Sequence, residues 1–322
     1  MSLQGIVKWL SLFTGLMIGV VTSIIGQDSG NSKPIPVNDS TFSTDAGRGA
    51  LLLTRFHSYE EFAALVQIEY YSSGKKMDPA TAKAKEVRLT HICGSRRVTS
   101  ILKEGVSQND FSKARDGGFW DKAELLFSAP YAVSNRQNLQ RIYTLSRRLS
   151  AIYGEGDVAF YDLAERMRYK IRQEDFNTLA TADFTEKGFI NTFNHFVAQA
   201  LMTSIFSEKL ADFVADAHER KNMPELMSGN FTKIQKEDIY TGAVDNYLDM
   251  INNEWGQEQG KILKERYHLS EDTEWTPLLL ANYLNDIQQY FSWAFEIGFN
   301  PFRPSDEVVI RFARKLNLVM GE

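Results

Sequence analysis

Residues Phe189 to Glu219 read FINTFNHFVAQALMTSIFSEKLADFVADAHE and carry the clearest signals of how the chain folds. Phe189 to Phe206 predicts one helix. The side-chain oxygen of Ser207 can accept a hydrogen bond from the first free amides of a second helix, so the sequence predicts that a new helix begins there. The two helices would then pack as an antiparallel hairpin.

The hairpin decides where two histidines lie. His195 and His218 are 23 residues apart, and on one straight helix that separation is roughly 35 Å at 1.5 Å per residue. On a hairpin, His195 near the start of the first helix faces His218 and Glu219 near the end of the second. The sequence therefore predicts that two imidazoles and a carboxylate come together.

A third segment, Asp238 to Gly256, adds polar groups along one stripe of a helix. The stripe, at positions i, i+4, i+7 and i+8, is formed by Asp245, Asp249, Asn252 and Asn253. Converging imidazoles, carboxylates and amides suit either a bound divalent metal ion such as zinc or acid/base catalysis. The predicted metal ligands are His195, His218 and Asp249. The predicted catalytic groups are Glu219, His218 and His195, with Asn252 and Asn253 orienting a substrate.

The same residues also fit a structural interpretation. Asn252 and Asn253, ahead of Gly256, can cap the C-terminal end of a helix, and Asp245 and Asp249 can form a solvated face. The run Ala-His-Glu-Arg-Lys can be a charged helix end whose cations lie favourably against the helix dipole. Sequence alone leaves both interpretations open.

The composition is that of a folded protein. The chain has 322 residues, of which 43% are hydrophobic and 24% charged, enough for the core of one large or two modest domains. Its net charge of −5 gives no sign of the basic surface that binds phosphates, so no nucleic-acid partner is expected. Cys93 is the single cysteine, which excludes an intramolecular disulfide and a thiolate-rich metal site.

The N-terminal part of the chain predicts export. Trp9 to Gly26 runs 18 residues without a formal charge, which is typical of a signal peptide or a transmembrane anchor. Residues 27–49 are rich in turn formers and predict a disordered linker. If residues 6–26 stay attached they would hold the protein at the membrane, and the remainder would lie in the periplasm or outside the cell.

From about Ala50 onward the chain shows helical periodicity almost throughout, and this predicts a mostly α, multi-helix, bundle-like body. Ser58 to Glu61 has the spacing of a capping box at the start of a helix that runs to Ile68, whereas Ala50 to Phe56 can be a short strand or a helix start. Further helices are predicted at residues 92–104, 120–128, 133–153 and 157–173. A polar stretch at 174–188 suggests a boundary between an N-terminal helical region, 50–180, and a helical domain, 181–322, that carries the polar cluster.

Three blocks of the sequence resemble an uncharacterised bacterial domain family. They are Asn194-His195, Ala217-His218-Glu219 and the run from Asp249 through Asn252-Asn253 to Gly256, which match the pattern (Arg/Asn)-His, Ala-His-Glu and Asp-x-x-Asn-Asn-x-x-Gly over residues 188–263. Members of that family occur in exported and toxin-like bacterial proteins. The resemblance implies that six polar residues act as a set: His195, His218, Glu219, Asp249, Asn252 and Asn253. The chain departs from the family in having Asn194 where Arg is common and an insertion from Lys221 to Tyr240.

Two functions follow from these patterns. The first is an exported or cell-envelope hydrolase, in which a metal ion or a His/Glu pair activates water. In that hydrolase Glu219 or His218 is the general base, His195 a ligand or acid, and Asp249 a ligand or an orienter of histidine. The second is a non-catalytic, membrane-anchored helical module, in which the same cluster is a hydrogen-bond network that locks helices together while the protein binds an envelope partner.

Overall fold

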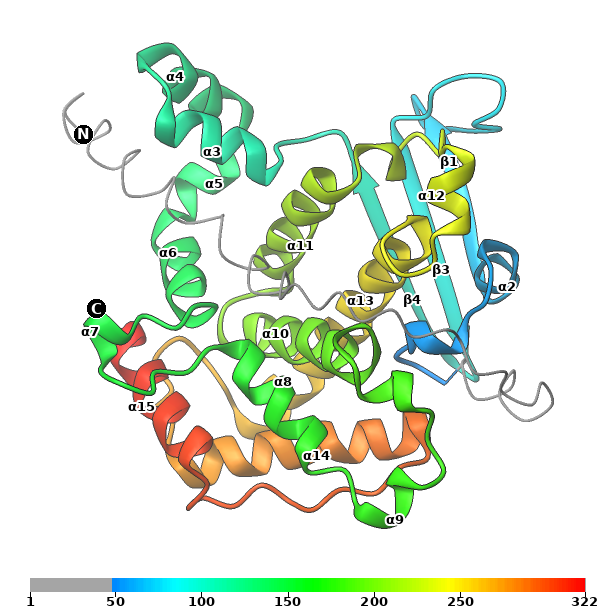
Figure 1. Ribbon diagram of the computed structural model, residues 1–322. Helices are drawn as coiled ribbons and strands as arrows, with labels where there is room; N and C mark the ends of the chain where they lie inside the picture. The colour runs from blue at the N-terminus through cyan, green and yellow to red at the C-terminus, as the bar shows by residue number, and fades with distance from the viewer. Residues whose placement is uncertain (1–47, 322) are drawn as a thin grey trace.

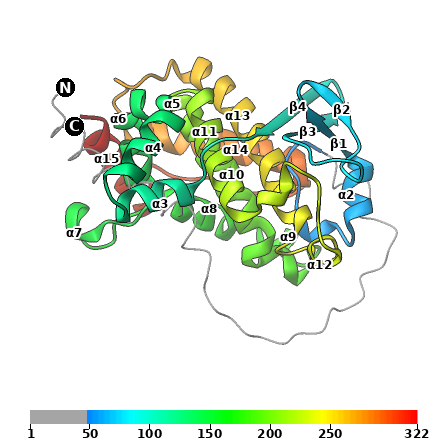
Figure 2. The same cartoon turned by 90° about the horizontal axis from the view of Figure 1, so that it is seen from above.

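The structure is a computed structural model that describes residues 48–321 and is mostly α-helical (Figure 1). Helix α13 (Ala243–Tyr267) lies between a small sheet on one side and helix α10 (Asn191–Ile205) on the other. Seen from above, the sheet occupies one end of the molecule and helices fill the remainder (Figure 2). The prediction of a mostly α, multi-helix body is therefore confirmed.

The sheet is antiparallel and is built from two hairpins. Its strands, in the spatial order β2-β1-β3-β4, are β1 (Val66–Ser72), β2 (Lys75–Met77), β3 (Glu86–Cys93) and β4 (Arg96–Lys103). The β1–β2 turn has positive φ at both Ser73 and Gly74, which is the two-residue turn that matches strand twist. In the β3–β4 turn the positive φ falls on Gly94, where glycine costs no strain.

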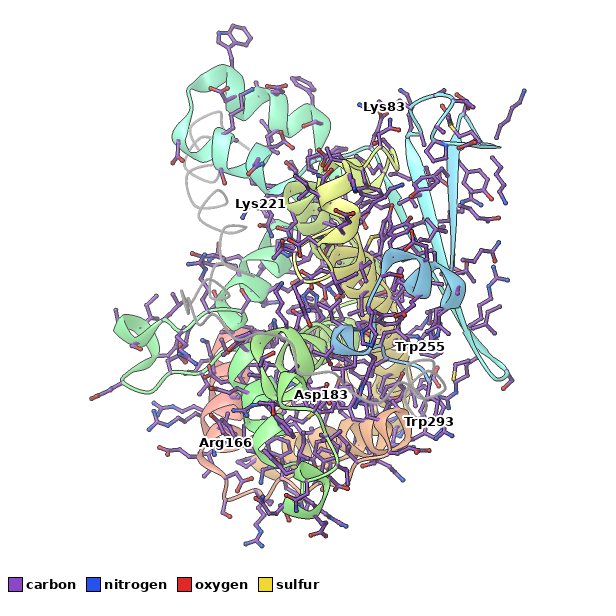
Figure 3. The ribbon with its side chains drawn as sticks, turned by 45° about the vertical axis from the view of Figure 1, so that its right-hand side comes forward. Lys83, Arg166, Asp183, Lys221, Trp255 and Trp293 are labelled. Carbon is purple, nitrogen blue, oxygen red and sulfur yellow. The ribbon has the colours of Figure 1, made fainter. Side chains whose placement is uncertain are left out.

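The helix predicted at residues 92–104 is wrong, and so is the expectation of helices almost throughout. Val98, Ser100 and Leu102 point into the protein while Arg97 and Ile101 point outward, which is the two-residue period of a strand. The inward face of the sheet packs on α13, where Trp255 donates from Nε1 to Nδ1 of the fully buried His91 at 3.0 Å. Trp255 is labelled in Figure 3.

Seven helices follow the sheet before α10. They are α3 (Gln108–Asp116), α4 (Phe119–Ser128), α5 (Pro130–Ser134), α6 (Arg136–Leu145), α7 (Ser150–Tyr153), α8 (Phe160–Tyr169) and α9 (Gln173–Phe176), and α2 (Tyr59–Leu65) precedes the sheet. Helix α4 confirms the prediction for 120–128. The helix predicted at 133–153 is interrupted, and at the interruption the amide of Leu149 donates to the carboxylate of Asp157 instead of to a helix carbonyl.

The remaining helices complete the C-terminal half. They are α11 (Glu208–Asn222), α12 (Lys233–Glu237), α14 (Pro277–Phe295) and α15 (Glu307–Gly321), with the short segments η3 (Leu53–Arg55), η4 (Thr181–Phe184), η5 (Glu186–Ile190, π-helical) and η6 (Pro224–Leu226). Ser58 caps α2 as predicted, since its Oγ accepts from the amide of Glu61. That helix ends at Leu65 and not at Ile68, because the chain enters β1 at Val66.

Helices α10 and α13 pack at very close range through two glycines of α13. A Cβ added to Gly256 would lie 2.6 Å from the carbonyl oxygen of Phe196, and one added to Gly260 would lie 2.6 Å from that of Ala200. Only glycine allows backbones to approach this closely. The close contact brings the polar side chains that precede Gly256 on α13 within hydrogen-bonding distance of α10.

Elements before and after residue 180 are joined by a buried carboxylate. Asp183 of η4, labelled in Figure 3, is fully buried; it accepts a hydrogen bond from Thr54 and pairs with Arg55 at 3.0 Å. Helix α8 also packs on α10, and β3 and β4 pack on α13. The domain boundary expected near residue 180 stays a prediction.

The expected signal peptide or anchor at 1–26 and the linker at 27–49 fall almost wholly outside the described residues; only the last two linker positions, Arg48 and Gly49, are within them. Within residues 48–321, every helix is too short or too polar to cross a membrane.

Candidate functional site

The predicted hairpin is confirmed. Helix α10 ends at Ile205, and Ser207 caps α11 by accepting from the amide of Leu210 at 3.3 Å. As a result His195, in the second turn of α10, and His218, in the last turns of α11, have ring centroids 6.5 Å apart. Both imidazoles are buried.

Helix α13 contributes the carboxylates and amides of the predicted stripe. Asp245, Asp249, Asn252 and Asn253 are all buried, and α13 continues to Tyr267. The alternative that Asn252 and Asn253 cap the end of a helix is therefore wrong, as is the alternative of a solvated acidic face. The stripe faces the interior of the protein.

Helices α10 and α13 are joined along this stripe by a ladder of polar pairs. The pairs, each separated by 58 residues, are Lys187–Asp245, Asn191–Asp249, His195–Asn253 and Gln199–Gln257. A constant offset means that the two segments run in the same direction, and steps of four residues keep each pair on the facing sides. The ladder fixes the position of each polar side chain along the helices.

His195 is held through both ring nitrogens. Its Nδ1 lies 3.1 Å from Oδ1 of Asn253, and its Nε2 lies 3.3 Å from Oδ2 of Asp249. A carbonyl oxygen only accepts, so Nδ1 carries the proton and Nε2 presents a lone pair. Because the carboxylate oxygen also presents lone pairs, the contact between His195 and Asp249 requires one shared proton.

Burial decides where that proton lies. It lowers the pKa of His195, with the hydrogen bond to Asn253 opposing the shift, and it raises the pKa of Asp249 to about 7. The positive charge of Lys187 and the hydrogen bond from Asn191 Nδ2, at 2.8 Å, hold the pKa of Asp249 down against burial. When the pair holds its shared proton, that proton therefore lies on Asp249 and not on His195. Because the pKa of Asp249 is about 7, the pair is close to half-protonated at neutral pH.

His218 is neutral and presents a hydrogen-bond donor. Its Nε2 lies 2.7 Å from the side-chain nitrogen of Asn222, and since that amide nitrogen donates, the ring proton is on Nδ1. Burial lowers the pKa of His218 to about 3, and electrostatic interaction with His195 and then with Lys221 acts in the same direction. Nδ1 is buried and has no hydrogen-bond partner among residues 48–321.

Glu219 is the most isolated polar group of the cluster. Its side chain is 1% exposed, and neither Oε1 nor Oε2 has a hydrogen-bond partner within the described chain. Burial raises its pKa well above the ordinary value, and the negative charges of Asp249, Asp245 and Asp216 raise it further. Both effects favour the protonated, neutral acid over the carboxylate.

Asp245 lies at the end of the ladder nearest to solvent. Its Oδ2 binds Nζ of Lys187 at 2.7 Å, and Lys187 is about one-third exposed. Its Oδ1 is buried without a hydrogen-bond partner in the described residues. Burial and the charge of Asp249 raise its pKa to about 7, against the opposing effect of Lys187.

The cluster thus holds four buried polar atoms without partners in residues 48–321: His218 Nδ1, Glu219 Oε1 and Oε2, and Asp245 Oδ1. Leaving a buried polar group unpaired costs about 1–3 kcal/mol, so proteins tolerate such groups mainly where they bind water, an ion or a reactant. His218, Glu219 and Asp245 come from two helices and influence one another electrostatically through His195 and Asp249. They define the candidate site.

Asn252, which was expected to orient a substrate, is bonded to the backbone of Leu51. Its Oδ1 accepts from the amide of Leu51 at 2.7 Å, and its Nδ2 donates to the carbonyl of Leu51 at 2.9 Å. The oxygen and the nitrogen of the Asn252 side chain are therefore both hydrogen-bonded to the backbone of Leu51. Asn253 in contrast faces His195.

The prediction of a metal site, with His195, His218 and Asp249 as ligands of a divalent ion such as zinc, is wrong. Within residues 48–321, no group of three or more His, Cys, Asp or Glu side chains is arranged to hold a metal ion. The reason lies in the hydrogen bonds: both nitrogens of His195 are used by Asn253 and Asp249, and Nε2 of His218 is used by Asn222. The lone pairs that a metal would need are already engaged.

Sequence reasoning missed three residues that hold the cluster: Lys187, Asn191 and Asn222. Asn191 and Asn222 stand four residues from His195 and His218, on the same helix faces, and that spacing could have indicated them. Lys187 lies in a π-helical turn at the start of α10, for which the sequence carries no comparable signal.

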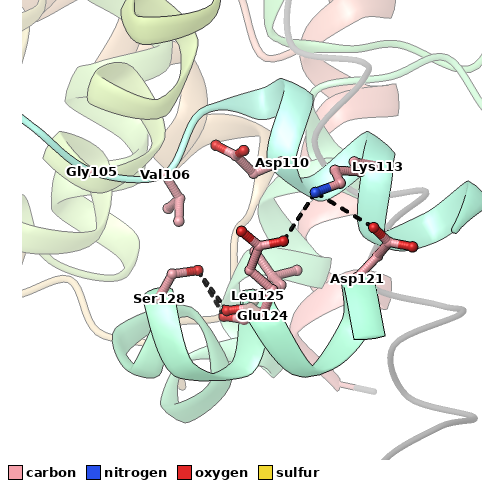
Figure 4. A pocket seen from close by; sticks show the side chains of 8 residues that line it. All are labelled: Gly105, Val106, Asp110, Lys113, Asp121, Glu124, Leu125 and Ser128. Atoms are coloured by element: carbon pink, nitrogen blue, oxygen red, sulfur yellow. Dashed lines mark hydrogen bonds and ion pairs between the residues drawn. The ribbon is translucent and has the colours of Figure 1, made fainter. Parts of the chain in front are cut away.

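A separate recess of about 220 Å³ lies between α3 and α4 (Figure 4). Its side chains are engaged with one another, since Lys113 pairs with Glu124 at 3.0 Å and with Asp121 at 3.5 Å. None of the residues that line it belongs to the histidine cluster.

Comparison with known proteins adds no relative: no family model, curated protein or solved structure matches this chain. The resemblance to the uncharacterised bacterial domain family stays a prediction.

Proposed function

We propose that the protein is a hydrolase of uncharged ester, amide or glycosidic bonds, with its active site in the cluster around Glu219. The observation that carries the proposal is the contrast between two neighbouring groups. Glu219 is a buried acid with both oxygens unpaired in the described structure, whereas the His195–Asp249 pair titrates near neutral pH. A proton donor beside a proton acceptor is what hydrolysis at neutral pH requires.

In this proposal the His195–Asp249 pair is the general base. When the pair is ionised it takes a proton from water, and the water oxygen attacks the electrophilic carbon of the substrate. The bond to the leaving group breaks, and the leaving oxygen or nitrogen takes the proton of Glu219. Water restores both groups to their starting states by returning a proton to Glu219 and removing one from the pair.

His218 supplies the third element of the proposed mechanism. Its Nδ1–H is a buried donor without a partner in residues 48–321, and it can bind the substrate oxygen on which negative charge develops. Because the pKa of His218 is lowered to about 3, the ring is neutral at neutral pH and its one N–H, on Nδ1, is the donor. These roles differ from the general-base role first expected for Glu219 and His218, because the raised pKa of Glu219 favours an acid.

The negative surroundings support an uncharged scissile group. Asp245, Asp249 and Asp216 all act on Glu219, and a phosphoester would bring further negative charge against them. The apolar stretch at residues 9–26 supports placing this activity in the cell envelope, which cell fractionation would test.

A second function is favoured by the ladder itself. Asn191, Asn253 and Asn252 hold the helices and the Leu51 backbone together through buried hydrogen bonds, which is how a structural network in a binding module behaves. In that case the same residues would contribute to stability and not to turnover.

The substitution Glu219→Gln separates the two functions. Glutamine keeps the shape of the neutral acid but cannot donate its proton, so the proposal expects kcat/KM on ester, amide or glycoside substrates to fall by about 10²- to 10⁴-fold. The free energy of unfolding should stay within about 1 kcal/mol, since neither side chain is charged at neutral pH. Glu237→Gln, at an exposed position of α12, is the matched control.

A wild-type protein that hydrolyses none of the three substrate classes would contradict the proposal. Equal rates in wild type and Glu219→Gln would contradict it as well, and would favour the structural network.

A further inference from the structure

Acidic side chains outnumber basic side chains around the candidate site. Asp245 and Asp249 come from α13, Glu219 and Asp216 from α11, and Asp238 precedes α13. Three cations act on these groups. Lys187 pairs with Asp245 and Arg220 pairs with Asp216. Lys221 acts on His218.

The unpaired atoms indicate what kind of group complements this charge. Three of the four are carboxyl oxygens, Glu219 Oε1 and Oε2 and Asp245 Oδ1. Carboxylate oxygens accept hydrogen bonds, and the donors that suit a negative site are the N–H groups of ammonium or guanidinium ions. Asp245 is the member nearest to solvent, so it would meet such a group first.

Lys187 shows how a cation fits at this position. Its ammonium group lies 2.7 Å from Oδ2 of Asp245, whereas Oδ1 of the same carboxylate is buried without a hydrogen-bond partner in the described residues. Lys187 is about one-third exposed and sits in the π-helical turn of η5, next to Gly188, whose backbone departs from helical geometry. The lysine is therefore both a model for a cationic ligand and a tethered competitor for it.

We propose that the site takes substrates that carry an ammonium or guanidinium group close to the hydrolysed bond, and that Oδ1 of Asp245 binds this group. The inference rests on the proposed function, whose active site it shares. It names Asp245 as the specificity-determining residue and Lys187 as the residue that limits access to it.

Binding of a small unreactive amine tests this without any turnover. The full chain is titrated with ethylammonium at about pH 8.5, above the pKa of Asp245, which is about 7. Binding is followed by the NMR signal of the His195 ring. Acetamide and acetate serve as neutral and anionic probes of similar size. The expected result is saturable binding of ethylammonium that is at least about tenfold tighter than that of acetamide or acetate.

Two variants should move the affinity in opposite directions. Asp245→Asn should weaken ethylammonium binding by about tenfold, because the charged acceptor is lost. Lys187→Met should tighten it several-fold, because the tethered competitor is removed. Asp272→Asn, at an exposed position outside the helices, should leave it unchanged.

Equal binding of the three probes, absence of ethylammonium binding, or unchanged binding in Asp245→Asn would overturn the inference. These outcomes are distinct from failure of the proposed function. If hydrolysis depends on Glu219 but the protein does not bind ethylammonium, only the inference of a cationic substrate is contradicted. If the protein binds ethylammonium but hydrolyses none of the substrates, only the proposal of a hydrolase is contradicted.

Discussion

The side chain of Asn252 binds both backbone polar groups of Leu51, accepting from its amide at 2.7 Å and donating to its carbonyl at 2.9 Å. The two residues are 201 positions apart, and both are fully buried. The hydroxyl of Thr192 donates to the same carbonyl at 3.0 Å. This contact anchors the start of the described chain against α13 and α10, the helices that carry His195 and Asp249.

Asn252→Ala should therefore destabilise the fold by about 3 kcal/mol. The substitution leaves the buried amide of Leu51 without an acceptor and removes one of the two donors to its carbonyl. Urea unfolding measures the loss. Asn109→Ala, at an exposed position of α3, should be neutral or slightly stabilising, because alanine has the higher helix propensity. Equal effects of the two substitutions would show that the Leu51 contact contributes little.

Gly256→Ala should separate α10 from α13. The new Cβ would lie 2.6 Å from the carbonyl oxygen of Phe196, so the helices must move apart or the backbone must distort, at a cost of about 2 kcal/mol or more. Gly321→Ala, at the last residue of α15, meets no atom within 4 Å and is the control.

The structural change caused by Gly256→Ala should extend to the candidate site. The hydrogen bond between His195 and Asn253 lies one turn before the contact, so the NMR signal of the His195 ring should shift in Gly256→Ala and stay in place in Gly321→Ala. An unchanged signal in a destabilised Gly256→Ala would contradict the account of how the glycine positions the site.

The raised pKa of Asp249 predicts how stability depends on pH. Burial raises this pKa to about 7, whereas an unfolded aspartate has a pKa of about 3.9. Between these values the folded protein holds a proton that the unfolded chain has released, so this group makes the free energy of unfolding fall as pH rises from about 4 to about 7. The effect reaches up to about 4 kcal/mol, at about 1.4 kcal/mol per pKa unit.

Asp249→Asn isolates that contribution. The free energy of unfolding of wild type minus that of the variant should decrease between about pH 4 and pH 8, because asparagine does not titrate. The buried histidines give the opposite slope below about pH 6.5, and the subtraction cancels it. Asp272→Asn should give a difference that does not depend on pH. A difference that increases with pH for Asp249→Asn would mean that Asp249 is a stabilising, ionised carboxylate.

The histidine hairpin could be predicted because its signals are local. Ser207 has a cap position, and the 23 residues between His195 and His218 exclude a single straight helix. The polar stripe on α13 follows from spacing alone. What spacing could not give is the partner of each side chain. Asn252 faces Leu51 and Asn253 faces His195, although the two asparagines are adjacent in sequence.

The sheet could not be predicted because the apolar residues of β4 are spaced like those of an amphipathic helix. Val98, Ile101 and Leu102 follow one another at helical steps, and Ile101 is an exposed apolar residue on the outer face of β4. With polar residues on that face the two-residue period would have been visible. The prediction of a metal site was wrong for a related reason. Sequence shows which residues meet, but the hydrogen bonds that engage the nitrogens of His195 depend on three-dimensional orientation.

The proposed mechanism requires Glu219 to be a protonated acid at neutral pH beside the titrating His195–Asp249 pair. The difference in infrared absorption between wild type and Glu219→Gln at about pH 7 tests it most directly, because a protonated carboxylic acid and a carboxylate absorb at different frequencies. Wild type should show a carboxylic-acid band that Glu219→Gln lacks. A carboxylate band in its place would show that Glu219 is ionised, and would contradict its role as the proton donor.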